Sequence, residues 1–287
     1  MGLTALVHGD TELAIDPLNG GSIRSASWRG EPILHCRPGT SVLDQGCFPL
    51  VPFSNRIAAS RFSFGSERVH LSPNHPQDPQ CPVLHGSGWL AEWDIRTITP
   101  ACAQMTYRHL AGEWPWNFSA SQTVTAFGDG FEVLLEIENL SDRAMPAGLG
   151  LHPYFPRTER TILRSLHRGE WQPDERQIPT ELELAPKPVD WWDGAPVGTR
   201  IVDTVYTDRQ GRLTIEWPER GLAARILPPA DLSFTTVYVP EGEEFFCVEP
   251  VSHMTDAFNR PGEDSGMRVL EQGERWAVTM RIEVCEL

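Results

Sequence analysis

The chain has 287 residues, 40% of them hydrophobic and 22% charged, a composition that supports a substantial core and excludes an intrinsically disordered protein. Its 39 acidic and 24 basic residues give a formal charge of −15, which argues against nucleic acid or an anionic membrane as a partner. No apolar run approaches the ~20 residues that a membrane-spanning helix needs, so we expect no membrane span.

The first fifteen residues lack both the basic segment and the apolar segment of a secretory signal peptide, so we expect none. The six cysteines are widely spaced and form no Cys-x-x-Cys pair, and a domain of this size does not need disulfides. We therefore expect reduced thiols and a cytoplasmic protein.

The first part of the chain is typical of short strands joined by turns. Strands are predicted over residues 3–8, 12–15, 21–28, 32–35 and 61–64. Because residues 48–57 contain two prolines, we expect no central strand there. Residues 69–81 are rich in Pro, Asn and Asp and are predicted to form a long surface loop.

Two hairpins are predicted next, the first pairing residues 93–99 with 104–109. The second pairs residues 117–127 with 131–139 around a tight Gly128-Asp129-Gly130 turn. Apolar side chains at positions 131, 133, 135 and 137 face one way and the glutamates at positions 132, 136 and 138 face the other, which predicts one buried and one wet face.

The second half of the chain begins with residues 158–197, which have a loop-like pattern. Strands are then predicted over residues 200–206, 212–217, 222–227, 234–238, 245–249 and 276–284. No amphipathic helix longer than about three turns is evident. We therefore predict an all-β protein, a large sandwich of many antiparallel strands that forms a single domain over residues 1–287.

Several functional motifs are missing from the sequence. Residues 148–153 lack the third glycine of the dinucleotide fingerprint, and the chain contains no phosphate-binding GxxxxGK[ST], no HExxH and no GxSxG. Only His70 and His75 of the nine histidines lie close together in the sequence, so we expect no metal, although ligands from distant strands could still meet.

Four segments place a polar residue beside glycine, proline or aromatic residues. They contain Asn55-Arg56, His85-Gly86, His152 and Glu249-Pro250. Pro153 favours an extended conformation for His152, which we expect near a strand end, with an imidazole able to exchange protons at neutral pH. Taken singly, each has an ordinary interpretation: a structural histidine, a surface ion pair or a solvated carboxylate.

In this order the four segments resemble the aldose 1-epimerase (galactose mutarotase) family. The resemblance spans nearly the whole chain through Pro52–Ile57, Leu84–Gly86 with Trp93, His152–Phe155 and Val248–Pro250. This chain departs from the family where Pro156-Arg157 follows Tyr-Phe, where Gly150-Leu151 precedes the histidine, and at Ser87–Trp89. The resemblance implies a divergent branch with the β-supersandwich fold.

The resemblance also implies an activity, the interconversion of the α and β anomers of a free aldose without a cofactor. Glu249 would be the general base at the anomeric hydroxyl and His152 the general acid at the ring oxygen. His85, Arg56 and Asn55 would hold sugar oxygens. The family's binding aspartate matches Asp203 best, with Asp190, Asp193 and Asp208 as rivals.

Three alternatives remain open from the sequence. A hexose-6-phosphate mutarotase would need additional basic residues such as Arg61 or Arg157. A non-catalytic carbohydrate-binding or sensing protein could use the same scaffold, although pure binding does not need an acid and a base. A glycoside-cleaving enzyme would more commonly use two carboxylates. Trp191 and Trp192 could stack on a sugar, but we favour packing for both.

Overall fold

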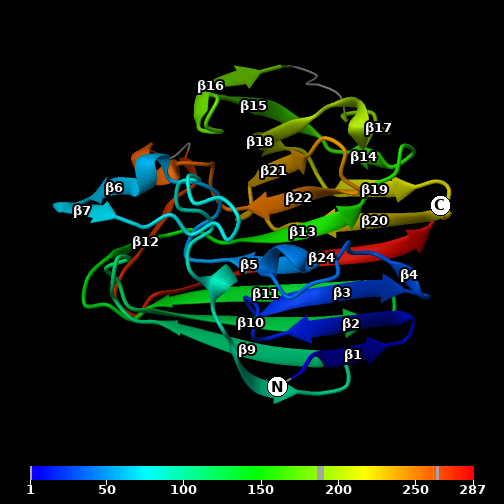
Figure 1. Ribbon diagram of the computed structural model, residues 1–287, viewed down its shortest axis with the longest axis horizontal. Coiled ribbons are helices and arrows are strands. Elements are labelled where there is room, and N and C mark those ends of the chain that lie inside the picture. Colours follow the sequence, from blue (N-terminus) through cyan, green and yellow to red (C-terminus); the bar gives the residue numbers. More distant parts are fainter. Residues whose placement is uncertain (1, 186–190, 261, 263–264) are drawn as a thin grey trace.

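Antiparallel strands make up nearly all the regular structure of the protein, for which a computed structural model describes residues 2–185, 191–260, 262 and 265–287 (Figure 1). The larger sheet has eleven strands in the order β1 (Thr4–His8), β2 (Thr11–Asp16), β3 (Ser22–Trp28), β5 (Cys47–Leu50), β13 (Gly150–Pro156), β22 (Phe245–Val251), β21 (Phe234–Val239), β18 (Val202–Arg209), β15 (His167–Pro173) and β16 (Pro179–Leu184), with β4 (Glu31–Pro32) paired to β3.

A second sheet has nine strands. Their order is β17 (Ala195–Pro196), β14 (Ile162–Arg164), β19 (Leu213–Trp217), β20 (Leu222–Leu227), β24 (Arg275–Glu286), β11 (Gly130–Asn139), β10 (Phe118–Phe127), β9 (Cys102–His109) and β8 (Asp94–Ile98). Two small sheets pair β12 (Met145–Ala147) with β23 (Arg268–Leu270) and β6 (Arg61–Phe64) with β7 (Glu67–His70).

The described helices are 3₁₀ turns of three residues each. They are η1 (Val42–Asp44), η2 (Ala58–Ser60), η3 (Gly88–Leu90), η4 (Val197–Thr199) and η5 (Ala257–Asn259). Within the part of the chain that the structure describes, none of these helices has the length and apolar character needed to cross a membrane.

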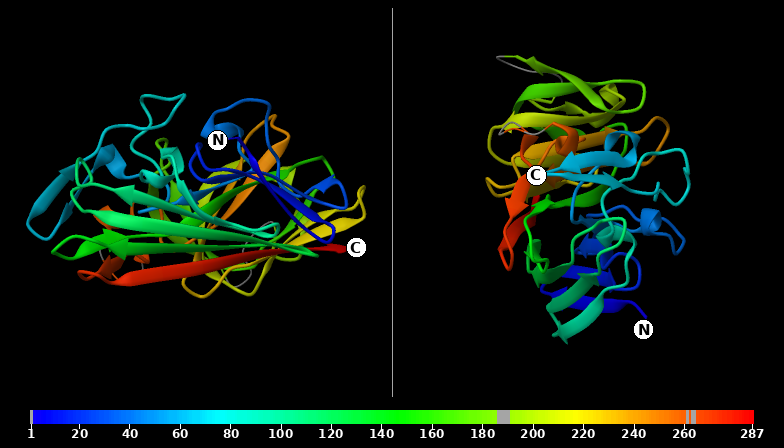
Figure 2. Two further views of the ribbon diagram at one scale, coloured as in Figure 1. Left: turned by 90° about the horizontal axis from the view of Figure 1, so that it is seen from below. Right: turned by 90° about the vertical axis from the view of Figure 1, so that its left-hand side faces the viewer.

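The two large sheets stack with their strands running in similar directions (Figures 1 and 2). The predicted hairpin of β10 and β11 is confirmed, and β24 pairs with the other edge of β11. Phe131, Val133, Leu135 and Ile137 are buried, whereas the glutamates between them are only partly covered. The period-two pattern therefore faces one core that joins both sheets.

Strands β13 and β22 are buried on both faces, as are most residues of their neighbours β5 and β21. One set of side chains, which includes Leu151 and Val248, joins the core between the sheets. The other set, which includes Tyr154 and Cys247, joins a second apolar cluster under the loops that cover the outer face. This outer face is where the candidate site lies.

Three expectations about regular structure are wrong. The strand predicted over residues 32–35 ends at Pro32, the last residue of β4. The first residues of the proline-containing segment 48–57 form β5, which lies between β3 and β13. Proline is tolerated because β5 pairs with β3 only at Cys47, so Pro49 has no ladder partner on that side. Residues 158–197 are not merely a loop, since they contain β14 to β17 at the far edges of both sheets.

The predicted strand ends near the two catalytic candidates are also wrong. His152 is the third residue of the seven-residue strand β13, and β22 continues past Glu249 to Val251. Both side chains therefore project from the interior of the sheet, where neighbouring strands restrict their movement.

Candidate active site

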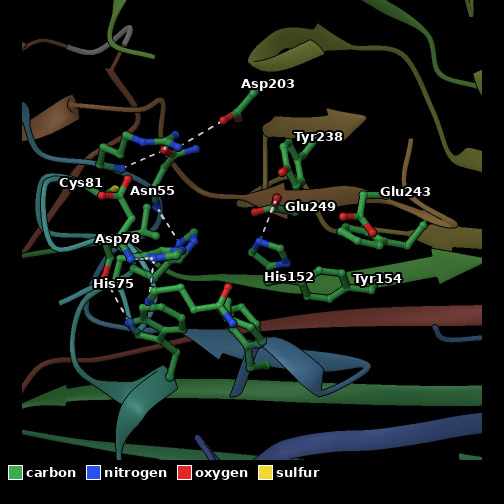
Figure 3. A pocket seen from close by; sticks show the side chains of 18 of the residues that line it. Asn55, His75, Asp78, Cys81, His152, Tyr154, Asp203, Tyr238, Glu243 and Glu249 are labelled. Atoms are coloured by element: carbon green, nitrogen blue, oxygen red, sulfur yellow. Dashed lines mark hydrogen bonds and ion pairs between the residues drawn. The ribbon is translucent and has the colours of Figure 1, made fainter. Parts of the chain in front are cut away.

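The alternation of side chains along β13 and β22 brings His152 and Glu249 together. Gly150 pairs with Val251 and Tyr154 with Cys247, so His152 lies opposite Glu249 on adjacent strands. Their side chains point toward each other, with 3.3 Å between His152 Nε2 and Glu249 Oε1 (Figure 3). An acid–base pair is thus formed by residues that lie far apart in the sequence.

Aromatic rings restrict the His152 imidazole. It stacks on Phe48, its cross-strand neighbour in β5, with ring centroids 4.5 Å apart. It also stacks on Tyr154, two residues along β13, at 4.7 Å. His85 approaches its edge at 5.2 Å. The ring orientation is therefore determined by packing on several sides.

Burial shifts both members of the pair toward their uncharged forms. It lowers the pKa of His152 to about 3. Burial, together with the nearby Asp203 carboxylate and against the opposing Arg56, raises the pKa of Glu249 well above its ordinary value. Burial thus favours the uncharged form, in which the Glu249 carboxyl is protonated and His152 is neutral; moving that proton to His152 gives the ion-paired form.

His85 reaches the same site from a strained turn. Both His85 and Asn55 have left-handed backbone conformations, with φ of 59° and 57°. Their backbones bond to each other, since His85 N–H donates to Asn55 O at 3.0 Å. In return, Asn55 N–H donates to His85 Nδ1 at 3.0 Å. Because Nδ1 is an acceptor, the neutral ring carries its proton on Nε2, which is left as a donor.

Arg56 is held by its two neighbours in the site. Its Nη2 lies 3.2 Å from Asp203 Oδ2, and its Nη1 donates to Asn55 Oδ1 at 3.2 Å. Burial lowers the pKa of Arg56, but Asp203 and the Cys81 side chain outweigh it and raise the pKa above its ordinary value. The guanidinium remains charged, with part of its donor fork available.

All six residues singled out from the sequence line one cavity of about 330 Å³: Asn55, Arg56, His85, His152, Asp203 and Glu249. This size lies at the lower end for small-molecule sites. Asp203 is the only one of the four candidate aspartates in this lining: Asp193 and Asp208 are not among the described lining residues, and Asp190 lies outside the described part of the chain.

Trp191 has the packing role that we favoured, whereas Trp192 is half-buried and its packing role stays a prediction. Trp191 is 3% exposed and belongs to the main core, with its ring 6.1 Å from Tyr206. Neither Trp191 nor Trp192 is among the described cavity-lining residues.

The cavity also contains residues that the sequence did not single out. Tyr154 and Phe48 flank His152, and Tyr238 lies across from them (Figure 3). Arg37 and Glu243 form a 2.5 Å ion pair at the cavity. No local motif could have found this pair, whereas the two-residue spacing of Tyr154 from His152 in a strand was a usable signal.

A model of the family described as aldose 1-epimerase matches residues 4–283. The chain belongs to the aldose 1-epimerase family. The uncharacterised Escherichia coli K12 protein YphB is 32% identical to it over 296 residues, an alignment that covers 99% of each chain. A second uncharacterised protein of that strain, YihR, is 23% identical and covers 73% of this chain and 70% of its own.

Solved structures agree with this family assignment. An Escherichia coli K12 protein provisionally described as an aldose 1-epimerase superposes with a TM-score of 0.90 at 30% identity, covering 99% of both chains. A galactose mutarotase-like protein of Clostridium acetobutylicum gives a TM-score of 0.86 at 16% identity, covering 99% of this chain and 95% of its own. The expected galactose mutarotase-like β-supersandwich is therefore confirmed.

Proposed function

We propose that this aldose 1-epimerase family member, acting as one domain over residues 1–287, interconverts the α and β anomers of a free, uncharged aldose. The observation that carries this proposal is the 3.3 Å contact between His152 Nε2 and Glu249 Oε1 at a cavity lined by hydrogen-bonding groups. We also propose a cytoplasmic location, which the six free thiols support.

The reaction needs one proton removed and one delivered in the same site. The Glu249 carboxylate removes the proton from the anomeric hydroxyl, the C1–O1 bond becomes a carbonyl, and the bond from C1 to the ring oxygen breaks. His152 Nε2–H protonates the ring oxygen as it leaves. After rotation about C1–C2, the same steps run in reverse on the other face of the carbonyl, so the enzyme ends with its original protons.

The shared proton of the pair fits this cycle. Removal of the sugar proton requires the ion-paired form, in which His152 carries the proton. That form is reached from the uncharged one by moving a proton over the 3.3 Å contact, without exchange with solvent. Each group of such a pair typically contributes ~10²–10⁴-fold to the rate.

The remaining residues are proposed to bind the sugar. His85 presents an Nε2–H donor whose tautomer is held by the Asn55 N–H. Arg56 presents the donors of its guanidinium that Asp203 and Asn55 leave free. Asp203 both holds Arg56 and offers a carboxylate to sugar hydroxyls. Neutral polyols suit such a mixed set of donors and acceptors.

The charges around the cavity favour an unphosphorylated sugar over a hexose 6-phosphate. Among the described lining residues the two arginines, Arg37 and Arg56, are each paired with a carboxylate. Asp78 adds a further acidic group to the lining. Arg61 and Arg157, considered for phosphate binding, are not in this described lining. A phosphate dianion would be repelled by the carboxylates of the lining, and the two arginines described there are already paired with carboxylates.

Exchange spectroscopy by NMR on a panel of free and phosphorylated aldoses tests the proposal. We expect the protein to accelerate anomer exchange of one or more free aldoses and to act far more weakly on their 6-phosphates. Saturable sugar binding without any acceleration would instead favour a non-catalytic carbohydrate-binding protein. Preferential acceleration for a 6-phosphate would overturn the substrate class.

A further inference from the structure

A third side chain with ligand chemistry lies beside the acid–base pair. Cys247 is two residues before Glu249 on β22, so its side chain projects from the same face of the sheet. One ring nitrogen of His152, Cys247 Sγ and one carboxylate oxygen of Glu249 all lie within 4.8 Å of one another. All three residues are buried, and Cys247 is 0% exposed.

Two of these three side chains each carry an atom that lacks a partner among the described residues. Glu249 Oε2 and His152 Nδ1 are buried and have no hydrogen bond there, and their side chains are only 3% and 8% exposed. Buried polar atoms are normally satisfied, so such atoms indicate a role that an additional group completes. A cation would satisfy an unpaired carboxylate oxygen directly.

We propose that His152, Cys247 and Glu249 bind a thiophilic divalent cation of the Zn²⁺ class, which occupies the acid–base pair and excludes the sugar. The donor set of one nitrogen, one sulfur and one oxygen matches Zn²⁺ and Cd²⁺, whereas Mg²⁺ and Ca²⁺ prefer oxygen ligands alone.

The separations are compatible with such a site. Bond lengths of ~2.0–2.3 Å to Zn²⁺ imply tetrahedral edges of about 3.3–3.6 Å between donor atoms. The widest edge of the cluster, at most 4.8 Å, would therefore contract by roughly 1 Å. His152 and Glu249 line the cavity whereas Cys247 does not, so the fourth ligand position would open into the cavity and accept water.

The consequence is inhibition. A bound cation would take the lone pairs that His152 and Glu249 need for proton transfer, and the protons displaced from the ligands would leave to the buffer. Cation and sugar would then exclude each other. The binding claim does not depend on the proposed function, because the cation can be detected without turnover.

Cadmium titration of the full chain tests the site. We expect a thiolate-to-Cd²⁺ charge-transfer absorption that saturates at about one equivalent and is lost or weakened at least ~10-fold in affinity in Cys247→Ala and Cys247→Ser. Cys81→Ser is the matched control, since Cys81 lines the same cavity without belonging to the cluster. It should bind Cd²⁺ as the wild type does.

Zn²⁺ inhibition provides the second readout. Inhibition should be competitive with sugar and should disappear in Cys247→Ala, whose own exchange activity and cooperative unfolding report that it is folded. Cd²⁺ binding or Zn²⁺ inhibition that persists unchanged in both Cys247 variants would overturn the site. An enzyme without exchange activity would refute the proposed function, while Cys247-dependent Cd²⁺ absorption would still support the site.

Discussion

Gly86, the residue after His85, should be intolerant of any side chain. Its φ is +71°, and a Cβ built on it would lie 2.5 Å from Val51 O and 2.7 Å from Pro52 N. Both contacts are to backbone, which cannot rotate away. Asn74 also stabilises the turn, because its side-chain amide donates to the carbonyls of Leu84 and Gly86.

The cost of Gly86→Ala can be separated into two parts. A non-glycine residue in the left-handed region costs about 1–2 kcal/mol, partly offset by ~0.4–1 kcal/mol from the lower entropy of the unfolded chain. Overlap with the backbone of Val51 and Pro52 adds roughly 1–3 kcal/mol. Gly273 isolates the first part, because its φ is +73° and no described heavy atom lies within 4 Å of the position that a Cβ would take.

The assay is urea denaturation of the wild type, Gly86→Ala and Gly273→Ala, followed by anomer-exchange kinetics. Gly86→Ala should be about 1–3 kcal/mol less stable than Gly273→Ala. A displaced His85 should lose about one hydrogen bond to the sugar, which raises KM roughly 2–10-fold with a smaller change in kcat. Equal stabilities for the two variants would refute the argument that backbone contact at Gly86 holds the turn.

Two further predictions follow from the surroundings of single residues. Arg56→Lys removes the planar donor fork that binds Asp203 and Asn55. We therefore expect KM to rise about 10-fold while kcat changes little. An unchanged KM would show that Arg56 does not bind the sugar. Burial lowers the pKa of His167, bonded to Ser165 and Thr235, to about 3, against ~6.5 in the unfolded chain. Below about pH 6.5 the unfolded chain binds a proton that the buried His167 does not. The free energy of unfolding therefore decreases as the pH falls toward 3, by about 2 kcal/mol at pH 5. Urea denaturation should show that, from pH 7 to pH 5, His167→Gln loses about 2 kcal/mol less unfolding free energy than the wild type. An equal loss in both proteins would contradict a neutral buried imidazole.

Much of the fold could be predicted because alternation in a strand is a local signal. Large apolar residues recur at every second position of β11 and β24, and the structure buries that face as expected. The signal fails where both faces are covered or where a strand lies at an edge. Strand β5 is buried throughout and contains a proline, and β16 is an edge strand with little burial.

The candidate site was predictable only through the family resemblance. Asn55, His85, His152 and Glu249 come from four distant segments, and the sequence alone contains no information that places His152 opposite Glu249. The pairing follows from the order of strands in the sheet, which is set by packing over the whole domain. The same holds for the Arg37–Glu243 pair and for the proximity of Cys247 to His152.

The most direct test of the central claim is the anomer-exchange rate of Glu249→Gln under saturating sugar. This substitution keeps the shape of the side chain and removes its ability to accept and return a proton. We predict a kcat on the order of 10²–10⁴-fold below the wild type in a folded protein. The control is Glu243→Gln, which removes another carboxylate of the cavity and should lower kcat by no more than a few-fold. A Glu249→Gln enzyme that exchanges anomers at the wild-type rate would contradict the proposed proton transfer by Glu249.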